Sequence, residues 1–255
     1  MTLEFAVVGA GVSLPGFSSL DAWRVGEADP EAKPIGEIIE RRSRRRSSLF
    51  TRALADSYAQ ALSQSELDPA EVSAVFGSAL GEVATMVGLL EQMWREAGPL
   101  SPMAFAMSVH NAAAGVVSIS TKNRGYTTSS GADFDTPAMA IMEAAGLLAD
   151  GSPTIVVVGD GSVPEKLVRG DAGWCMLSAA LALVPSEGAP DDAPRLVLPT
   201  MAEADLAPAD LDGAASRNPC AGMLDLIDAL ERGKSGIIRL DRGRGRGWSA
   251  ELRFP

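Results

Sequence analysis

The chain has 255 residues, 46% of them hydrophobic, and carries a net charge of −11 at pH 7. That length and composition allow one substantial hydrophobic core, in one domain or at most two, while the acidic balance argues against nucleic acid as the main partner, because phosphate binding needs a positive surface. The longest apolar stretches, such as 155–158 and 177–184, fall far short of the ~20 residues of a membrane span, and the N-terminus lacks a basic, apolar leader pattern, so we expect a cytoplasmic protein.

The first predicted element is a buried strand over residues 4–8, which ends in the glycine pair of Gly9–Gly11. Two glycines after a strand also occur in nucleotide-binding loops, where a third glycine follows three positions later. That third position is Leu14, and Pro15 follows where a helix would begin. A phosphate-binding loop is therefore not indicated, and we expect no cofactor.

Five arginines fall within six positions of the next segment: Arg41, Arg42, Arg44, Arg45 and Arg46. Charge runs usually face water, so one interpretation is a solvated loop or helix start. On an acidic chain the cluster also suits a docking patch for an acidic partner, whose association it would accelerate in a salt-dependent way. The overall acidity disfavours a nuclear-localisation or nucleic-acid function.

Hydrophobic periodicity predicts a helix over 52–63, a strand over 72–76 and a further helix over 82–97. The apolar face of that further helix has offsets of 0, 3, 4 and 7 and consists of Met86, Leu89, Leu90 and Met93. This spacing is typical of an amphipathic helix that packs on a core. We expect these side chains to be core rather than a binding surface.

Small residues dominate 108–121, which predicts a helix with close neighbours. A short strand over 126–129 follows, and then a helix with an apolar stripe over 138–148. Residues 155–158 form an uninterrupted apolar run, which predicts a strand buried on both faces, and a strand over 175–184 would complete the sheet. Such alternation of strands and helices is typical of a layered α/β fold.

The composition changes after Pro185 to an exposed connection rich in proline and aspartate. We therefore expect one domain over 1–185 and a short extension over 186–255 that packs on the same domain. Within that extension, Asn218-Pro219 predicts a helix start and Gly233 its end. Two further strands, over 236–240 and 248–254, are predicted to form a β-hairpin.

The two cysteines, Cys175 and Cys220, lie far apart in the sequence and outside any CxxC spacing. Neither a zinc site nor a redox pair is therefore indicated, and we expect no metal. Free cysteine is most often a small buried hydrophobe. We expect both side chains to be buried, with Cys175 in the strand over 175–184.

Several ordered segments carry a resemblance to a known family. They are FAVVGAGVSLPGFSSLDAWR at 5–24, SELDPAEVSAVFGSALG at 65–81, SPMAFAMSVHNAAAGVVSIS at 101–120 and GYTTSS at 125–130. In their order and spacing they resemble the N-terminal half of a β-ketoacyl synthase over roughly the first 185 residues. The resemblance implies an α/β, thiolase-like layered fold, here as a single ketosynthase-type half with a C-terminal helix and β-hairpin appended.

The same resemblance locates the position of the catalytic nucleophile. Setting residues 140–141 against the family's alanine-isoleucine pair places Phe134 where ketosynthases carry cysteine, between Asp133 and Asp135. Decarboxylative condensation needs a thiolate and imidazole donors, and a phenyl ring cannot attack a thioester. The family's two catalytic histidines lie in its C-terminal half, whereas His110 is the only histidine here. We therefore assign no catalytic residue.

For the other candidate residues the resemblance implies a subunit interface, because the helix over 108–121 and the strand over 126–129 lie where two subunits of the family meet. The implied interface and tunnel residues are His110, Asn111, Ala113, Gly115, Tyr126, Ser129 and Phe134. His110 is expected to pack within a helix there, and Phe134 is a candidate tunnel plug. The arginine cluster would dock an acyl carrier protein, whose recognition surface is acidic.

The resulting hypothesis is a chain-length-factor-like subunit, silent alone, that forms a heterodimer with a complete ketosynthase in carrier-protein-dependent polyketide, aryl polyene or fatty-acid-like biosynthesis. The chain departs from the chain-length factors of aromatic polyketide systems, which carry glutamine at the nucleophile position and retain both halves. Two alternatives stay open. One is a free-standing acyltransferase or thioester hydrolase using His110 with Ser129 or Ser130, although no GxSxG is present; the other is a purely structural homodimer.

Overall fold

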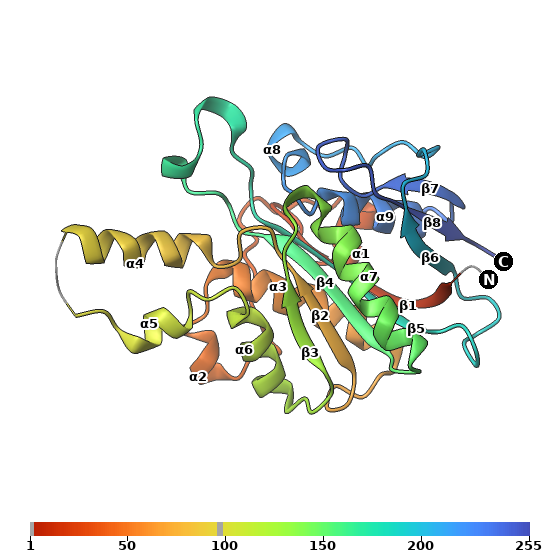
Figure 1. Cartoon of the computed structure of the whole chain (residues 1–255), viewed down its shortest axis with the longest axis horizontal. Coiled ribbons are helices and arrows are strands. Elements are labelled where there is room, and N and C mark those ends of the chain that lie inside the picture. The colour runs from red at the N-terminus through yellow and green to blue at the C-terminus, as the bar shows by residue number, and fades with distance from the viewer. Residues whose placement is uncertain (1–2, 96–98) are drawn as a thin grey trace.

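The computed structural model describes residues 3–95 and 99–255, and its central feature is one mixed β-sheet (Figure 1). The strands are β1 (Glu4–Ser13), β2 (Ser73–Gly77), β3 (Thr127–Ser130), β4 (Thr154–Asp160), β5 (Leu177–Pro185), β6 (Arg195–Thr200), β7 (Gly236–Arg239) and β8 (Ser249–Arg253). They lie in the order β3-β2-β4-β5-β1-β6-β8-β7. One edge of the sheet is therefore β3, and the other is the C-terminal hairpin.

The direction of strand pairing divides the sheet into two parts. β2 pairs in parallel with β3 and β4, whereas the pairs from β4 onward are antiparallel. Every residue of β4 is buried, which confirms the predicted strand with two covered faces. β3 has a neighbour on one side only, so the backbone groups of its outer side are open to pairing with another chain.

Two helices cover one face of the sheet. α3 (Leu49–Ser65) and α6 (Ala112–Thr121) pack on β2, β4 and β5 in one apolar cluster. The rings of Tyr58 and Phe76 stack there with centroids 6.2 Å apart, and Val117 of α6 is buried in the same cluster. Because burying a side chain such as Phe76 contributes roughly 1.5–3 kcal/mol, this layer fixes α6 against the sheet beside the edge strand β3.

Two other helices cover the opposite face, namely α7 (Thr136–Ala149) and α9 (Ala221–Glu231). Ile141 of α7, Val156 of β4 and Ile227 of α9 belong to one apolar cluster. The predicted apolar stripe of α7 is buried at Ala138, Ile141, Ala145 and Leu148. The C-terminal helix thus shares a core with the middle of the chain.

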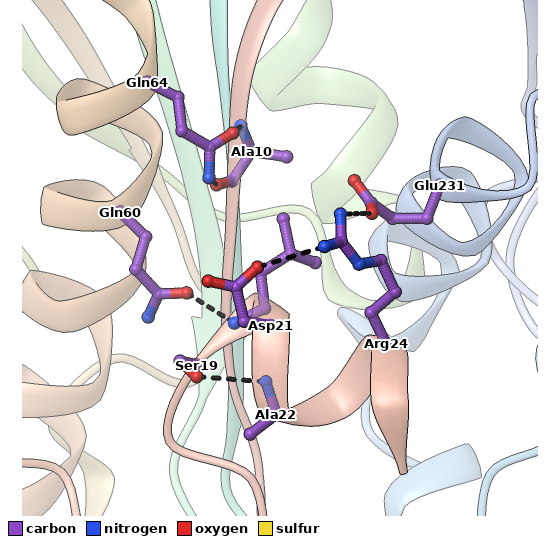
Figure 2. A network of polar contacts seen from close by, with 9 residues as sticks. Ala10, Ser19, Asp21, Ala22, Arg24, Gln60, Gln64 and Glu231 are labelled. Carbon is purple, nitrogen blue, oxygen red and sulfur yellow. Dashed lines mark hydrogen bonds and ion pairs between the residues drawn. The ribbon is translucent and has the colours of Figure 1, made fainter. Parts of the chain in front are cut away.

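The glycine pair of β1 allows α3 to approach the strand closely. A Cβ atom at Gly9 would collide with the backbone carbonyl of Ala61, and one at Gly11 with that of Ser57. Two glutamines of α3 then bond the strand. The Gln64 amide pairs with the N–H and C=O of Ala10 (Figure 2), and Gln60 does the same at Val12. The glycines therefore serve helix packing.

A short helix, α1 (Leu20–Val25), connects this region to the C-terminal part of the chain (Figure 2). The Ser19 hydroxyl accepts a hydrogen bond from the Ala22 N–H and so caps the helix. Arg24 forms ion pairs with Asp21 and with Glu231 at the end of α9. Arg24 and Asp21 are both more than half exposed, so each pair contributes ~0–1 kcal/mol.

The C-terminal segment continues the sheet, because β6, β8 and β7 follow β1 in the strand order. The predicted hairpin is confirmed as β7 and β8. At Gly222 of α9 a Cβ atom would collide with the backbone carbonyl of Leu240, so helix and strand end are in backbone contact. The boundary at residue 185 stays a prediction.

The predicted helix start, with Asn218 as the N-cap and Pro219 as the first helical residue, is two residues early. A separate short helix, α8 (Gly213–Ser216), precedes it, and α9 begins at Ala221. The Asn218 amide points inward, where it donates to the carbonyls of Asp160 and Cys175 and accepts from the Cys220 N–H. Asn218 therefore links the segment to the end of β4.

The prediction that the apolar face of 82–97 is core is wrong. In α4 (Val83–Arg95) Leu89 is buried, but Met86, Leu90 and Met93 are exposed. The physical reason is that α3, α6, α7 and α9 already cover the sheet, and α4 projects away from it together with α5 (Pro102–Ala106) (Figure 1). Residues 96–97 of the predicted helix lie outside the described residues.

Two smaller predictions also need correction. The helix expected over 108–121 begins at Ala112, which leaves His110 in the preceding turn. Cys175 is half-buried and lies ahead of β5 rather than in it, because its carbonyl bonds to Asn218 and not to a neighbouring strand. Within the part of the chain that the structure covers, no helix is long and apolar enough to cross a membrane.

Candidate functional site

Phe134 lies in a single 3-10 turn, Asp133–Asp135, that leads from β3 into α7. Asp133 adopts a positive φ of 53°, a conformation that is strained for a residue with a side chain. The guanidinium carbon of Arg244 lies 5.8 Å from the centroid of the half-buried Phe134 ring, within the range of a cation–π contact. The position that resembles a nucleophile site is therefore covered by an arginine of the C-terminal hairpin.

The loop between β7 and β8 is fixed over this turn. Asp135 is buried and accepts a hydrogen bond from the Arg246 N–H at 2.9 Å. A Cβ atom at Gly245 would collide with the Asp135 carboxylate, so only glycine fits there. The backbone of the loop thus contacts the Asp135 side chain of the turn directly.

Two buried carboxylates, those of Asp241 and Asp225, bind residues of the same loop and fix its conformation. Asp241 accepts hydrogen bonds from the N–H groups of Gly243 and Gly247 and from the Arg239 side chain. Asp225 of α9 binds the Arg242 guanidinium in a two-pronged pair. A buried pair of this kind fixes geometry more than it adds stability. Arg244 is therefore held over Phe134 by a defined loop.

Neither cysteine offers a nucleophile in place of Phe134. Burial, with a further contribution from the charge of the nearby Asp212, raises the pKa of Cys175 to about 11. Cys220 is fully buried, and burial, followed by the charge of Asp160, raises the pKa of its thiol well above the usual value. Because the thiolate is the reactive form, both thiols are inert near neutral pH.

His110 is exposed in the turn before α6, which corrects the expectation that it packs within a helix. Its Nε2 lies 2.7 Å from the carbonyl oxygen of Ser78, so that nitrogen is the donor of the hydrogen bond. The hydroxyls of Ser129 and Ser130 have no hydrogen-bond partner among the described residues. The structure therefore does not join His110 to either serine as a base and nucleophile.

A hollow of about 480 Å³ lies between α6 and the edge strand β3, and we call it the α6–β3 hollow. Its lining residues are His110, Asn111, Ala114, Gly115, Ser118, Thr127, Thr128 and Ser129. Four of the predicted interface residues, His110, Asn111, Gly115 and Ser129, are thus brought together. Two large exposed side chains lie nearby in the chain: Ile119 in α6 and Tyr126 immediately before β3.

Two predicted interface residues lie elsewhere. Ala113 is buried in the core between α6 and the sheet, so its side chain does not face the hollow. Phe134 lines a different hollow, together with Met139, Arg244 and Trp248. The predicted interface and tunnel residues therefore do not form one site. Four of them line the α6–β3 hollow, and Phe134 lines a hollow that the C-terminal loop covers.

The arginine cluster forms a four-residue helix, α2 (Arg41–Arg44), and the turn after it. Arg41, Arg42, Arg45 and Arg46 are exposed and line a shallow hollow with Glu40. No carboxylate of the described residues forms an ion pair with any of them. The Glu40 N–H bonds to Ser120 of α6, which places the cluster next to the helix that borders the α6–β3 hollow.

One buried group was not anticipated from the sequence. Asp160, at the end of β4, is fully buried and accepts hydrogen bonds from the Ser78 hydroxyl and from the N–H groups of Ala79 and Leu80. It thus holds the loop whose Ser78 carbonyl binds His110. An aspartate that directly follows a fully apolar strand was the available signal. The arginines at every second position of 242–246 were the corresponding signal for the covering loop.

Comparison with known proteins agrees with this arrangement. The family model described as β-ketoacyl synthase, N-terminal domain, matches residues 21–249. Among solved structures, a chain of a ketosynthase (ApeO) in complex with its chain length factor (ApeC) from Xenorhabdus doucetiae superposes with a TM-score of 0.71 at 20% identity, covering 98% of this chain and 99% of that one. No curated protein matches the sequence.

Two further structures show the same fold. AntDE:AntF, a type II polyketide synthase carrier protein in complex with its ketosynthase, gives a TM-score of 0.67 at 14% identity and covers 99% of both chains. The ishigamide ketosynthase/chain length factor gives 0.62 at 15% identity, over 91% of this chain and 74% of that one. The sheet and its helices are therefore the layered, thiolase-like α/β fold.

Proposed function

The chain belongs to the family of β-ketoacyl synthase N-terminal domains, and from that membership we propose that it is a catalytically silent subunit that pairs with a complete β-ketoacyl synthase. The observation that carries the proposal is that Phe134, which we place at the nucleophile position, has a side chain that cannot attack a thioester and lies under Arg244. The nucleophile is absent from the proposed position, and the only histidine is bonded to a backbone carbonyl. Such a family member can still function when a second subunit supplies the chemistry.

The α6–β3 hollow is the proposed contact surface for that second subunit. β3 is an edge strand whose outer side can pair with a strand of another chain. Ile119, 72% exposed, and Tyr126, 52% exposed, are large apolar side chains beside it. Covering them would remove apolar surface from water, which favours association.

The role in the complex is the one its structural relatives suggest. Two of the similar structures are described as a ketosynthase with its chain length factor. We propose a chain-length-factor-like role for this chain in carrier-protein-dependent polyketide, aryl polyene or fatty-acid-like biosynthesis. In this role Phe134 would limit the space available to the growing acyl chain. Among the described residues no hydrogen bond joins His110 to Ser129 or Ser130, so the structure gives no support to a free-standing hydrolase.

The exposed arginines of the cluster are the proposed docking site of an acyl carrier protein. Their charges are not neutralised by ion pairs within the described part of the chain, so they remain available to an acidic partner. Replacing Arg41, Arg42, Arg45 and Arg46 by glutamine should weaken carrier-protein binding to the heterodimer and flatten its salt dependence. Arg169→Gln, at another exposed site, is the matched control and should leave binding unchanged.

Substitution of two glycines that lie in helices tests the pairing of this chain with the ketosynthase. Gly115 of α6 and Gly146 of α7 are both exposed, and a Cβ atom at either meets no neighbouring atom, so glutamate at either position should be compatible with the fold. With a tag on the ketosynthase alone, Gly115→Glu should abolish co-purification of this chain, whereas Gly146→Glu should not. Ala113 is unsuitable because a charge there would disrupt the core.

Co-purification of the Gly115→Glu variant at the wild-type level would contradict the proposed surface. A symmetric self-complex that excludes the ketosynthase would favour the structural homodimer. Thioester cleavage by the chain alone that is abolished by His110→Ala or Ser130→Ala would favour the independent enzyme.

A further inference from the structure

A cavity that the proposed function does not use lies in the C-terminal part of the chain, where α8, α9, β7 and β8 come together (Figure 1). Its volume is about 380 Å³, which is in the range of sites for small organic ligands. We call it the β7–β8 cavity. It combines an apolar and a basic lining, formed by Leu206, Pro208 and Ile238 and by Arg239, Arg242 and Arg244. This combination suits a ligand with both an apolar and an anionic part.

Hydrogen bonds hold the segments that line the β7–β8 cavity in place. The carbonyl of Ile237 in β7 accepts from both N–H groups of residues 205–206, so the segment after β6 is fixed to the edge strand. Further along, the Ala209 N–H donates to Asp225 of α9, and the Ala209 carbonyl accepts from Arg242. The cavity is therefore already formed in the chain alone, and binding a ligand there requires little additional ordering.

The three arginines of the β7–β8 loop have different surroundings. Arg242 is paired with the buried Asp225, and Arg246, which does not line the cavity, is paired with Asp135. Arg244 lines the cavity and is exposed, and no carboxylate in the described part of the chain forms an ion pair with it. The charge of Arg244 is therefore available to an anion in the cavity.

Arg239 supplies a second guanidinium to the same cavity. Its Nε donates to Asp241, whereas its two terminal nitrogens donate to no group of the described residues. The three arginines of the lining and their two aspartate partners, Asp225 and Asp241, leave one net positive charge. A carboxylate neutralises that charge and accepts two parallel N–H bonds from a guanidinium. A phosphate dianion would instead place excess negative charge close to two buried aspartates.

We propose that the β7–β8 cavity binds a small organic carboxylate, with its oxygens on Arg239 and Arg244 and its apolar part against the apolar residues of the lining. Arg244 also lies over the Phe134 ring. The two contacts are compatible because an aromatic ring binds the face of a guanidinium, whereas a carboxylate binds its edge. A bound carboxylate would therefore hold Arg244 over Phe134. Every lining residue belongs to this chain, so the inference does not depend on the proposed function.

The probe for the test is benzoate, a carboxylate with a compact apolar group, titrated calorimetrically into the chain alone. It should bind more tightly than acetate, which lacks the apolar group, and than benzyl alcohol, which lacks the charge. Arg244→Gln should raise the Kd for benzoate at least about tenfold, because a hydrogen bond between charged groups is lost. The replaced side chain is exposed, so the thermal unfolding midpoint should not change. Arg246→Gln, in the same loop but outside the cavity, is the matched control and should leave the Kd unchanged.

A second variant tests Arg239 without leaving the buried Asp241 unpaired. Arg239→Lys keeps a positive charge beside Asp241 but removes the planar fork, so it should also weaken benzoate binding. Equal losses of affinity in Arg244→Gln and Arg246→Gln would indicate general attraction to a basic loop and would overturn the site. Tighter binding of inorganic phosphate than of benzoate would contradict the carboxylate class, and a wild-type chain that binds no benzoate would contradict the inference altogether.

Discussion

At the scale of single residues, the chain lacks more than the cysteine of its family. Phe134 occupies the proposed nucleophile position, Arg244 lies over its ring, and Asp135 is bonded to the Arg246 backbone. His110, the only imidazole, is bonded to the Ser78 carbonyl. Restoring a thiol would therefore supply a nucleophile without donors to stabilise the charge that develops in the reaction.

The corresponding prediction concerns Phe134→Cys. Assayed alone, this variant should neither decarboxylate a malonyl thioester nor condense it with an acyl thioester, since the imidazole donors are missing. Release of carbon dioxide from the malonyl thioester is the measurement, with Phe134→Leu as the control for altered packing. Condensing activity in Phe134→Cys alone would show that the missing cysteine is the sole defect.

Asp160 gives a pH-dependent prediction. Burial raises its pKa above the usual 3.8, against the hydrogen bonds from Leu80, Ala79 and Ser78 that lower it. The folded state therefore binds the proton more tightly than the unfolded state, and the stabilisation that this provides is complete below pH 3.8 and is lost as pH rises through the folded pKa.

The variant to compare is Asp160→Asn, which should be less stable than wild type at a cost of ~1–3 kcal/mol. Both oxygens of the Asp160 carboxyl group accept hydrogen bonds, whereas an amide accepts through its oxygen only. As pH rises above 3.8 this difference should shrink, since the wild-type chain loses stability and the variant has no titrating group there. Denaturant unfolding of both chains at a series of pH values measures this difference in the free energy of unfolding. Asp150→Asn, at an exposed position, is the control, and a difference that grows with pH would contradict the account.

At the scale of elements, the contact between α9 and the end of β7 fixes the C-terminal segment to the sheet. Gly222→Ala should destabilise the protein by several kcal/mol, because the added methyl group collides with the Leu240 backbone, which cannot move freely. Gly146→Ala in α7 is the matched change: its Cβ meets no neighbouring atom, and alanine should stabilise the helix by up to ~1 kcal/mol. Thermal unfolding that shows both variants equally stable would contradict this packing.

The elements that sequence patterns predicted well are those whose pattern reflects contacts within this chain. The apolar run of β4 and the stripe of α7 are buried as expected, and the hairpin of β7 and β8 forms where turn residues indicated. The apolar stripe of α4 was predicted to be core but is largely exposed. Periodicity shows that a helix has an apolar side, but it does not show whether the rest of the same chain covers that side.

The candidate site was partly predictable. Sequence order placed Phe134, and the SVHN segment placed His110 and Asn111 at the rim of one hollow. The separation of Phe134 from that hollow, and the arginine that covers it, depend on a loop about 110 residues later in the chain. Contacts between residues so far apart have no local pattern, so Arg244 and Asp160 were found only in the structure.

At the scale of the molecule, the exposed features that the fold does not use lie on neighbouring elements. The Glu40 N–H just before α2 is bonded to α6, and α6 and β3 border the hollow. α4 follows Gly81 and α5 precedes His110, which contacts Gly81 and lines the same hollow. The opposite edge of the sheet is the C-terminal hairpin, which covers Phe134. These features lie on one side of the chain, which is the surface that we propose for other proteins.

The central claim is that this chain acts only as the partner of a complete ketosynthase. The most direct measurement is to co-express the two chains, purify through a tag on one of them, and determine the mass and the condensing activity of the complex. The account predicts a one-to-one heterodimer whose activity requires both chains. A ketosynthase that is fully active without this chain, while the chain elutes separately, would contradict it.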